Sequence, residues 1–312
     1  MDQAAAARLA QAVLQGDRRA LARALTVVEN RWAGGSDLMS ILRSRRGCAK
    51  VIGVTGSGGA GKSTLVCALA AALLGRGRHV AVVAIDPSSP LSGGAVLGDR
   101  VRMSALADSG AYIRSLATRG AVGGLCQAAR EVVDVLDAAG FDIVLVETVG
   151  VGQDEVDVMR LADQVLVVCT PGQGDGVQAI KAGVMEIADL FVVNKFDQAG
   201  AHQVVSQLEQ MLATRGDPAR RNRPVFGTTA TTGEGVGALA DRLLSLGEGG
   251  RRRPVFEQQL ADEVLRLLQP QLRLALQRHP GLADQGAHDI ARRMLGNALG
   301  DPPGDPPGDD PV

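Results

Sequence analysis

The spacing of apolar residues at the start of the chain is helical. Within residues 1–48, Leu9, Val13 and Leu14 fall on one face of a first helix. Asp17 stands where the N-cap of the next helix is expected, because a short carboxylate can accept hydrogen bonds from the first turn of a helix. The pattern predicts a helical N-terminal region over residues 1–48.

From residue 49 the pattern changes to short runs rich in valine and isoleucine, separated by helical stretches. These runs lie at residues 50–55, 79–85, 142–147, 164–169, 190–194 and 223–229. Near-continuous apolar runs are typical of strands that helices cover on both faces, as in parallel sheets. Helices are expected between them, for example over residues 62–74 and 123–139. The pattern predicts an α/β fold over residues 49–250, with a doubly wound, mainly parallel sheet.

The last part of the chain is again helical in pattern. Leucines and valines recur at helical spacing through residues 251–300, and Pro270 is expected to kink or divide this region. Residues 301–312 repeat Gly-Asp-Pro-Pro and contain almost nothing to bury, so a disordered tail is predicted there.

Composition removes several classes of function. The net charge of −1 gives no indication of a nucleic-acid or acidic-membrane partner. No apolar stretch is long enough to span a bilayer, and the N-terminus is interrupted by charges, unlike a signal peptide. The four cysteines show neither zinc-site nor redox spacing. A cytoplasmic protein with free thiols is expected.

The segment "GVTGSGGAGKSTL" contains the pattern Gly-x-x-x-x-Gly-Lys-Ser between a predicted strand and a predicted helix. Glycines let backbone N–H groups turn inward around phosphates, and the following helix adds its positive N-terminal end. Lys62 is expected to reach the β- and γ-phosphates, and Ser63 to offer its hydroxyl to Mg²⁺. The residues predicted to contact a nucleotide here are Gly58, Gly59, Ala60, Gly61, Lys62, Ser63 and Thr64.

The tetrapeptide "NKFD" directly follows a predicted strand and indicates which base is bound. The carboxylate of Asp197 can accept from guanine N1–H and N2–H₂. Adenine has no matching donors and would leave it unpaired, at a cost on the order of a few kcal/mol. Lys195 is expected along the base and ribose, and Asn194 to tie loops together. Thr229 and Ala230 are expected to add backbone contacts to guanine O6. The predicted ligands are therefore GTP and GDP.

Three acidic residues stand where this fold would place a metal site. Asp86 and Glu147 end predicted strands, and Asp99 lies in a glycine-rich loop. Because strand carboxyl ends converge on the ligand crevice, these acids and Ser63 are predicted to hold Mg²⁺ or its water ligands. Glu147 opens a Glu-x-x-Gly pattern, and the N–H of Gly150 is the expected sensor of the γ-phosphate.

The loop over residues 149–157 is glycine-rich and polar, as expected of a segment that a γ-phosphate orders and hydrolysis releases. Gln153 is a candidate to orient the attacking water. Lys181 is a candidate to bring an ammonium toward the metal-site acids, and the alternative is a surface lysine. The predicted catalytic set comprises Lys62, Glu147, Gly150, Gln153 and Lys181.

Several segments together resemble the MeaB/ArgK-type G proteins, the GTPase chaperones of adenosylcobalamin-dependent acyl-CoA mutases. These segments are "GDRRALARALTVVEN", "GSGGAGKSTL", "AIDPSSPLSGGAVLGDRVRM", "IRSLATRGAVGG", "ETVGVGQDEVD", "GDGVQAIKAGVMEIAD" and "NKFD". The resemblance covers about residues 15–300. It implies a P-loop GTPase that is usually a homodimer, with residues 251–300 as a helical dimerisation arm.

The resemblance also implies a role. Such a protein gates cofactor loading onto the mutase and protects it from inactivation, through the cobalamin-binding domain or subunit. Hydrolysis is slow alone and stimulated by the mutase, and the stretch around Lys181 matches a switch that responds to it. Two features depart from the family: Ser57 and Gly58 stand where many relatives carry prolines, and Arg114 and Arg119 leave the role of their loop open.

Other readings remain. A nickel-insertion GTPase would need Cys/His metal motifs, and none of the four histidines lies in one. A second alternative is an ATP-driven transport or partitioning protein, or a protein kinase. The deviant phosphate loop of the partitioning ATPases has a lysine where this chain has Ser57, and "NKFD" favours guanine. A binding module with incidental hydrolysis is a third alternative. The sequence leaves open which acyl-CoA mutase is the target.

Overall fold

The computed structural model divides the chain into two compact units, Met1–Val255 and Phe256–Val312. It describes residues 1–44, 49–86, 110–117, 124–148, 159, 161–172, 185, 187–213, 223–246, 269, 273, 274 and 277. The four described positions of the second unit are all helical. Among the described residues, no helix combines the length and the apolar character that a membrane crossing requires.

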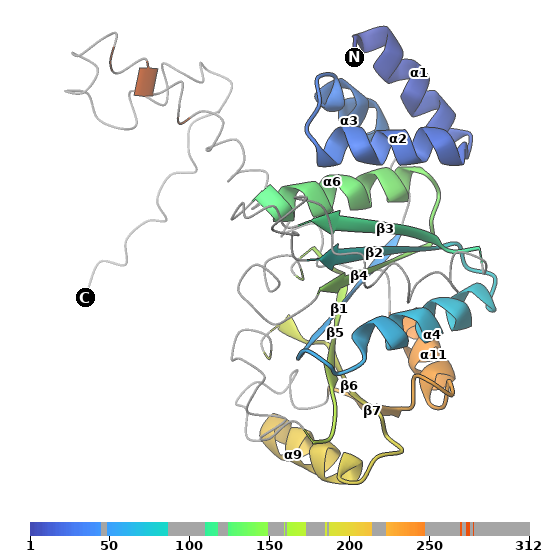
Figure 1. Cartoon of the computed structure of the whole chain (residues 1–312), viewed down its shortest axis with the longest axis vertical. Coiled ribbons are helices and arrows are strands. Elements are labelled where there is room, and N and C mark those ends of the chain that lie inside the picture. Colours follow the sequence, from blue (N-terminus) through green and yellow to red (C-terminus); the bar gives the residue numbers. More distant parts are fainter. Residues whose placement is uncertain are drawn as a thin grey trace, which may run out of the picture. The chain divides into compact units, whose positions relative to one another are not determined.

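The first unit is built on a seven-stranded sheet in which every described strand pair is parallel (Figure 1). The strands are β1 (Lys50–Gly56), β2 (Val80–Asp86), β3 (Tyr112–Ala117), β4 (Ile143–Thr148), β5 (Gln164–Cys169), β6 (Leu190–Asn194) and β7 (Val225–Thr228). Their order is β3-β2-β4-β1-β5-β6-β7. Every residue of β4, β5 and β6 is buried, as the continuous apolar runs predicted. The predicted parallel α/β fold is confirmed.

Helices cover both faces of this sheet. The helices α4 (Lys62–Leu74) and α11 (Val236–Ser245) pack on one face, and α6 (Gly124–Ala138) and α9 (Ala201–Ala213) pack on the other. Successive strand residues alternate between the two cores, so that in β1 Val51 joins the core under α6 and Ile52 joins the core under α4. This alternation is the period of two that a strand imposes on its side chains.

Three N-terminal helices add a layer outside α6 (Figure 1). They are α1 (Gln3–Leu14), α2 (Arg18–Glu29) and α3 (Gly35–Arg43). Asp17 caps α2, because its Oδ1 accepts from the N–H groups of Arg19 at 2.7 Å and Ala20 at 3.1 Å. The N-cap expected from the sequence is confirmed, and the helices share one hydrophobic core with α6.

The strand β3 was not among the runs that the sequence analysis identified. It lies at the edge of the sheet and pairs only with β2 among the described strands. Its sequence, "YIRSLA", mixes polar and apolar residues because most of its positions are half-buried. Arg114 in this strand forms a salt bridge with Glu29 of α2 and donates to Thr26 Oγ1 at 3.2 Å. Arg114, whose role the sequence leaves open, therefore fastens β3 to α2.

Candidate functional site

The candidate site lies at the carboxyl edge of the sheet, where the loops after β1, β6 and β7 meet. In an open parallel sheet, this edge forms the crevice in which ligands bind. The loop after β1 covers residues 57–61 and leads directly into α4. Hydrogen bonds from side chains join the loops after β6 and β7 to this loop.

The phosphate loop has a backbone that excludes side chains at two points. Gly61 has a φ of 83°, and a Cβ there would lie 2.5 Å from Nδ2 of Asn194. Gly56 has a φ of 147°, and a Cβ there would lie 2.2 Å from the carbonyl oxygen of Val168 in β5. Both conformations are ones that glycine alone adopts without strain. The glycines of the motif are thus required by the loop and by its neighbours.

Lys62 begins α4 and turns back over the loop. Its side chain is buried, and Nζ donates to the carbonyl oxygens of Gly56 at 2.9 Å and Ser57 at 3.0 Å. An ammonium carries three donors and prefers several oxygen partners. The lysine therefore places a positive charge inside the curve of the loop, where phosphate oxygens can replace carbonyl oxygens as its acceptors.

Asn194, the last residue of β6, connects three loops through one buried side chain. Its Nδ2 donates to the carbonyl oxygens of Ala60 at 3.0 Å and Gly61 at 3.4 Å, both in the phosphate loop. Its Oδ1 accepts from Thr228 Oγ1 at 3.2 Å and from the Ala230 N–H at 3.1 Å. Thr228 is the last residue of β7, and Ala230 lies in the loop that follows it. The amide uses donors and acceptors together, so it fixes the spacing between these loops.

The rest of "NKFD" is held against the same loops. Lys195 has a φ of 56°, and its Nζ donates to the Gly59 carbonyl at 2.9 Å. Phe196 donates its N–H to Thr228 at 3.0 Å, and a Cβ on Gly227 would meet its ring at 2.7 Å. The Asp197 carboxylate that follows is exposed. The loop thus presents this carboxylate to solvent at the crevice.

The two residues that follow β7, Thr229 and Ala230, have their backbone N–H groups engaged within the protein. Ala230 donates to Asn194, and Thr229 donates to the Glu234 carbonyl at 3.0 Å. The predicted contacts of these N–H groups with guanine O6 stay a prediction, and each contact requires an exchange of partner. Thr228, which the sequence analysis did not single out, orients Asn194 through its hydroxyl; a threonine ending the last strand was the available signal.

Ser63 and Glu147 come together at the metal site predicted from the sequence. Ser63 Oγ donates to Glu147 Oε1 at 2.7 Å, and the glutamate is 6% exposed at the end of β4. A hydroxyl and a carboxylate are the oxygen donors that a hard divalent cation prefers, so these two residues fit Mg²⁺. The backbone of Asp86 ends β2, the neighbouring strand. The side chain of Asp86, together with the other predicted residues Asp99, Gly150, Gln153 and Lys181, lies outside the described residues.

Comparison with known proteins gives consistent matches over most of the chain. A family model described as methylmalonyl Co-A mutase-associated GTPase MeaB matches residues 21–278. A protein of Pyrococcus abyssi is 44% identical over 264 residues, which is 82% of each chain. The GTPase ArgK of Escherichia coli is 40% identical over 262 residues, or 80% of this chain and 79% of its own. The crystal structure of LAO/AO transport system kinase matches with a TM-score of 0.66 and 28% identity, over 95% of this chain and 98% of that one.

Proposed function

Because the chain belongs to the MeaB family of GTPases, we propose that it is a nucleotide switch that binds and hydrolyses GTP and acts on an adenosylcobalamin-dependent acyl-CoA mutase. The observation that carries the proposal is the bridge made by Asn194. This side chain holds the phosphate loop and the "NKFD" loop in one hydrogen-bonded unit. A nucleotide whose phosphates bind at the first loop is therefore positioned for its base to contact the second.

Guanine selectivity follows from Asp197 in this proposal. Its exposed carboxylate offers two acceptor oxygens, which match the N1–H and N2–H₂ donors of guanine. Lys195 donates from Nζ to the Gly59 carbonyl and so links the "NKFD" loop to the phosphate loop. From this position it would cover the ribose of the bound nucleotide. Adenine would leave the carboxylate without partners and bind more weakly.

The phosphate end is bound by the backbone of Gly58, Gly59, Ala60 and Gly61, with the amides of Lys62, Ser63 and Thr64 at the start of α4. Lys62 exchanges its carbonyl partners for oxygens of the β- and γ-phosphates. This exchange keeps the ammonium in place while its charge becomes paired with the ligand. Binding therefore needs little movement of the side chain.

Ser63 and Glu147 hold Mg²⁺ in the proposal, with Asp86 and Asp99. The ion, when bound, neutralises charge on the phosphate oxygens as the terminal phosphate departs. Glu147 accepts the hydrogen bond of the Ser63 hydroxyl, which leaves the lone pairs of Oγ directed away from the carboxylate. Gly150 senses the γ-phosphate, Gln153 orients water, and Lys181 or the partner supplies positive charge.

The proposed partner is a mutase, contacted at its cobalamin-binding domain or subunit. The family description, a methylmalonyl-CoA mutase-associated GTPase, supports this choice. We propose that GTP hydrolysis gates adenosylcobalamin loading and protects the mutase, is slow without it, and is stimulated by it. A homodimer joined through residues 251–300 and a cytoplasmic location complete the proposal.

The decisive experiment tests nucleotide selectivity independently of the partner. Titration of the full chain with GTP and ATP should show a clear preference for GTP, and Asp197→Asn should transfer it to xanthosine triphosphate, because xanthine carries a carbonyl where guanine has N2–H₂. Gln198→Asn, an exposed change in the same loop, is the control. Equal affinity for ATP and GTP in the unmodified chain would refute the base assignment.

The partner is tested by capture of cobalamin-dependent mutase subunits on the immobilised chain, with a non-hydrolysable GTP analogue and with GDP. A mutase retained more strongly in one nucleotide state supports the proposal. If GTP binds selectively but no mutase is retained in either state, the partner assignment is wrong and the GTP assignment stands.

A further inference from the structure

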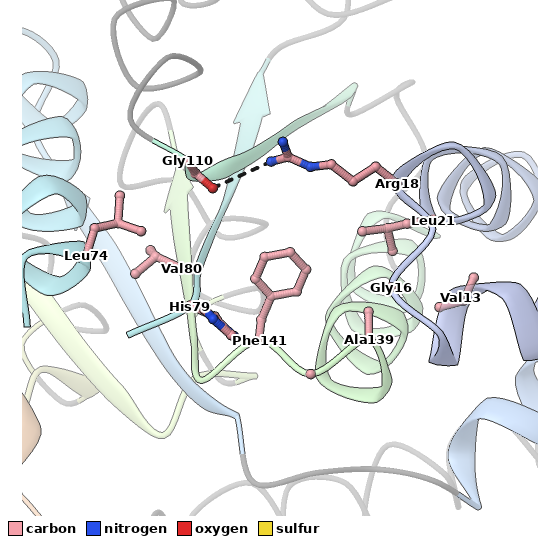
Figure 2. A pocket seen from close by; sticks show the side chains of 11 residues that line it. Val13, Gly16, Arg18, Leu21, Leu74, His79, Val80, Gly110, Ala139 and Phe141 are labelled. Carbon is pink, nitrogen blue, oxygen red and sulfur yellow. Dashed lines mark hydrogen bonds between the residues drawn. The ribbon is translucent and has the colours of Figure 1, made fainter. Parts of the chain in front are cut away.

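A pocket, seen from close by in Figure 2, lies at the amino ends of the strands, whereas the phosphate loop follows the carboxyl end of β1. Its lining includes Val80 at the start of β2 and Phe141 just before β4, so it belongs to the amino ends of the strands. Its volume is about 390 Å³, within the range of about 300–1,000 Å³ that small-molecule sites occupy. The pocket is therefore large enough for a ligand and separate from the nucleotide crevice.

The floor of this pocket is apolar and built from α2, α4, β2 and the loop before β4. Leu21 of α2 and Val80 are buried, and Leu74 at the end of α4 and Phe141 are half-buried. The Phe141 ring contacts Tyr112 of β3 at a centroid distance of 5.9 Å, which fixes its orientation. Figure 2 shows the ring pointing toward the space beneath the Arg18 side chain. An apolar tail on a ligand would find a preformed surface here.

One edge of the pocket carries a positive charge. The guanidinium of Arg18 reaches from α2 to the carbonyl of Gly110, at a long 3.5 Å (Figure 2), and makes no salt bridge with any residue that the structure describes. The nearby carboxylates have other partners: Asp17 accepts from the first turn of α2, and Asp142 accepts from the His79 N–H at 2.7 Å. The guanidinium is thus available to an anionic group above an apolar floor.

We propose that this pocket binds a small carboxylate with a short apolar tail, its head group on Arg18 and its tail on Leu21, Val80 and Phe141. A guanidinium presents two parallel N–H donors, which match the two oxygens of a carboxylate. A bare inorganic anion would use only the arginine and leave the apolar floor facing water. The combination of a cationic edge and an apolar floor therefore selects an amphipathic anion.

Calorimetric titration of the full chain with hexanoate tests this proposal, with 1-hexanol, hexylamine and inorganic phosphate as comparison ligands. Hexanoate should bind with one site per chain and about tenfold more tightly than hexanol, as expected for a charge-assisted hydrogen bond. Arg18→Gln should remove that difference. Arg19→Gln, an exposed change one residue away that does not line the pocket, should preserve it.

A charge reversal provides a positive signal that misfolding cannot imitate. Arg18→Glu should weaken hexanoate and strengthen hexylamine, while GTP binding at the opposite edge stays unchanged. Absence of hexanoate binding, equal affinity for hexanol and hexanoate, or an unchanged affinity in Arg18→Gln would each overturn the proposal. Phosphate binding as tight as hexanoate would also overturn it, because the apolar floor would then contribute nothing.

Discussion

Ser63 donates a hydrogen bond of 2.7 Å to Glu147, and this bond joins the first turn of α4 to the end of β4. The helix α4 follows the phosphate loop, and β4 pairs with β1, the strand that precedes this loop. Their contact brings two oxygen donors together before any ligand binds. Since ordering of ligand groups costs free energy, a pair that is already assembled lowers the cost of binding a cation.

The first prediction concerns this pair. Glu147→Gln keeps the shape of the side chain but removes its charge, so the Mg²⁺ concentration for half-maximal GTP hydrolysis should rise by about 10- to 100-fold. Binding of GTP without Mg²⁺ should change little, since the phosphate loop is intact. Titrating Mg²⁺ in a hydrolysis assay and in a nucleotide-binding assay separates the two effects. Glu209→Gln on the exposed side of α9 is the matched control. Equal losses in both assays would argue against a metal role.

The second prediction concerns Asn194. Asn194→Ala leaves partners in both the phosphate loop and the loop after β7 without their hydrogen bonds. We expect about 3 kcal/mol less unfolding free energy, since buried groups left without partners cost roughly 1–3 kcal/mol each and some regain water. GTP affinity should fall as well. Urea unfolding measures the first effect, and Gln198→Ala in the neighbouring exposed turn should show neither. An unchanged unfolding midpoint would mean that the three loops hold their spacing without this amide.

The sheet could be predicted from the sequence because its buried strands are continuous apolar runs. The strand β3 was missed for the opposite reason. At the edge of the sheet only part of its surface is buried, so the sequence around Arg114 lacks a continuous apolar run. Its place depends on a salt bridge with Glu29, a residue far away in the chain. Contacts of that kind have no local signature, so periodicity does not reveal them.

The candidate site was likewise predicted in part: features with a local sequence pattern were found, and a feature that depends on strand register was not. The phosphate loop has a local signature, because the left-handed turns at Gly59 and Gly61 require glycine. Ser63 was predicted to serve a metal site from a motif and Glu147 from a strand end, and the structure brings the two side chains together. The role of Thr228 in orienting Asn194 was not visible, since it depends on the register of β6 and β7.

The third prediction uses two glycines of one loop that differ in their surroundings. Gly61→Ala places a Cβ 2.5 Å from Asn194 in a left-handed conformation, so it should lower stability by about 1–2 kcal/mol and weaken GTP binding. Gly58→Ala meets no atom within 4 Å, so the fold should keep its stability. GTP binding should also be kept, since the position has room for a side chain and many relatives carry proline where this chain has Ser57 and Gly58. Thermal unfolding and nucleotide titration of both variants decide. Undiminished GTP affinity in Gly61→Ala would place the phosphates elsewhere.

The fourth prediction concerns Cys169 in β5, whose thiol is 2% exposed. Burial raises its pKa from the ordinary 9.0 to about 12, because the apolar surroundings disfavour the thiolate. Below pH 9 the thiol is protonated in both the folded and the unfolded chain. The contribution of the buried thiol to the free energy of unfolding is then fully present. Between pH 9 and about 12 the unfolded chain releases a proton that the folded chain keeps, and stability falls as the pH rises.

Urea unfolding between pH 8 and pH 10.5 measures this effect as the slope of stability against pH. Burial also raises the pKa of Tyr112, so the native slope contains more than one contribution. Cys169→Ala should therefore reduce the slope by an amount that approaches about 1.4 kcal/mol per pH unit at the alkaline end. The comparison of slopes is unaffected by the constant cost of the cavity that alanine leaves. Val167→Ala in the same strand leaves a cavity but removes no titrating group, so it should keep the native slope. A Cys169→Ala chain with the native slope would show that this thiol ionises before the chain unfolds.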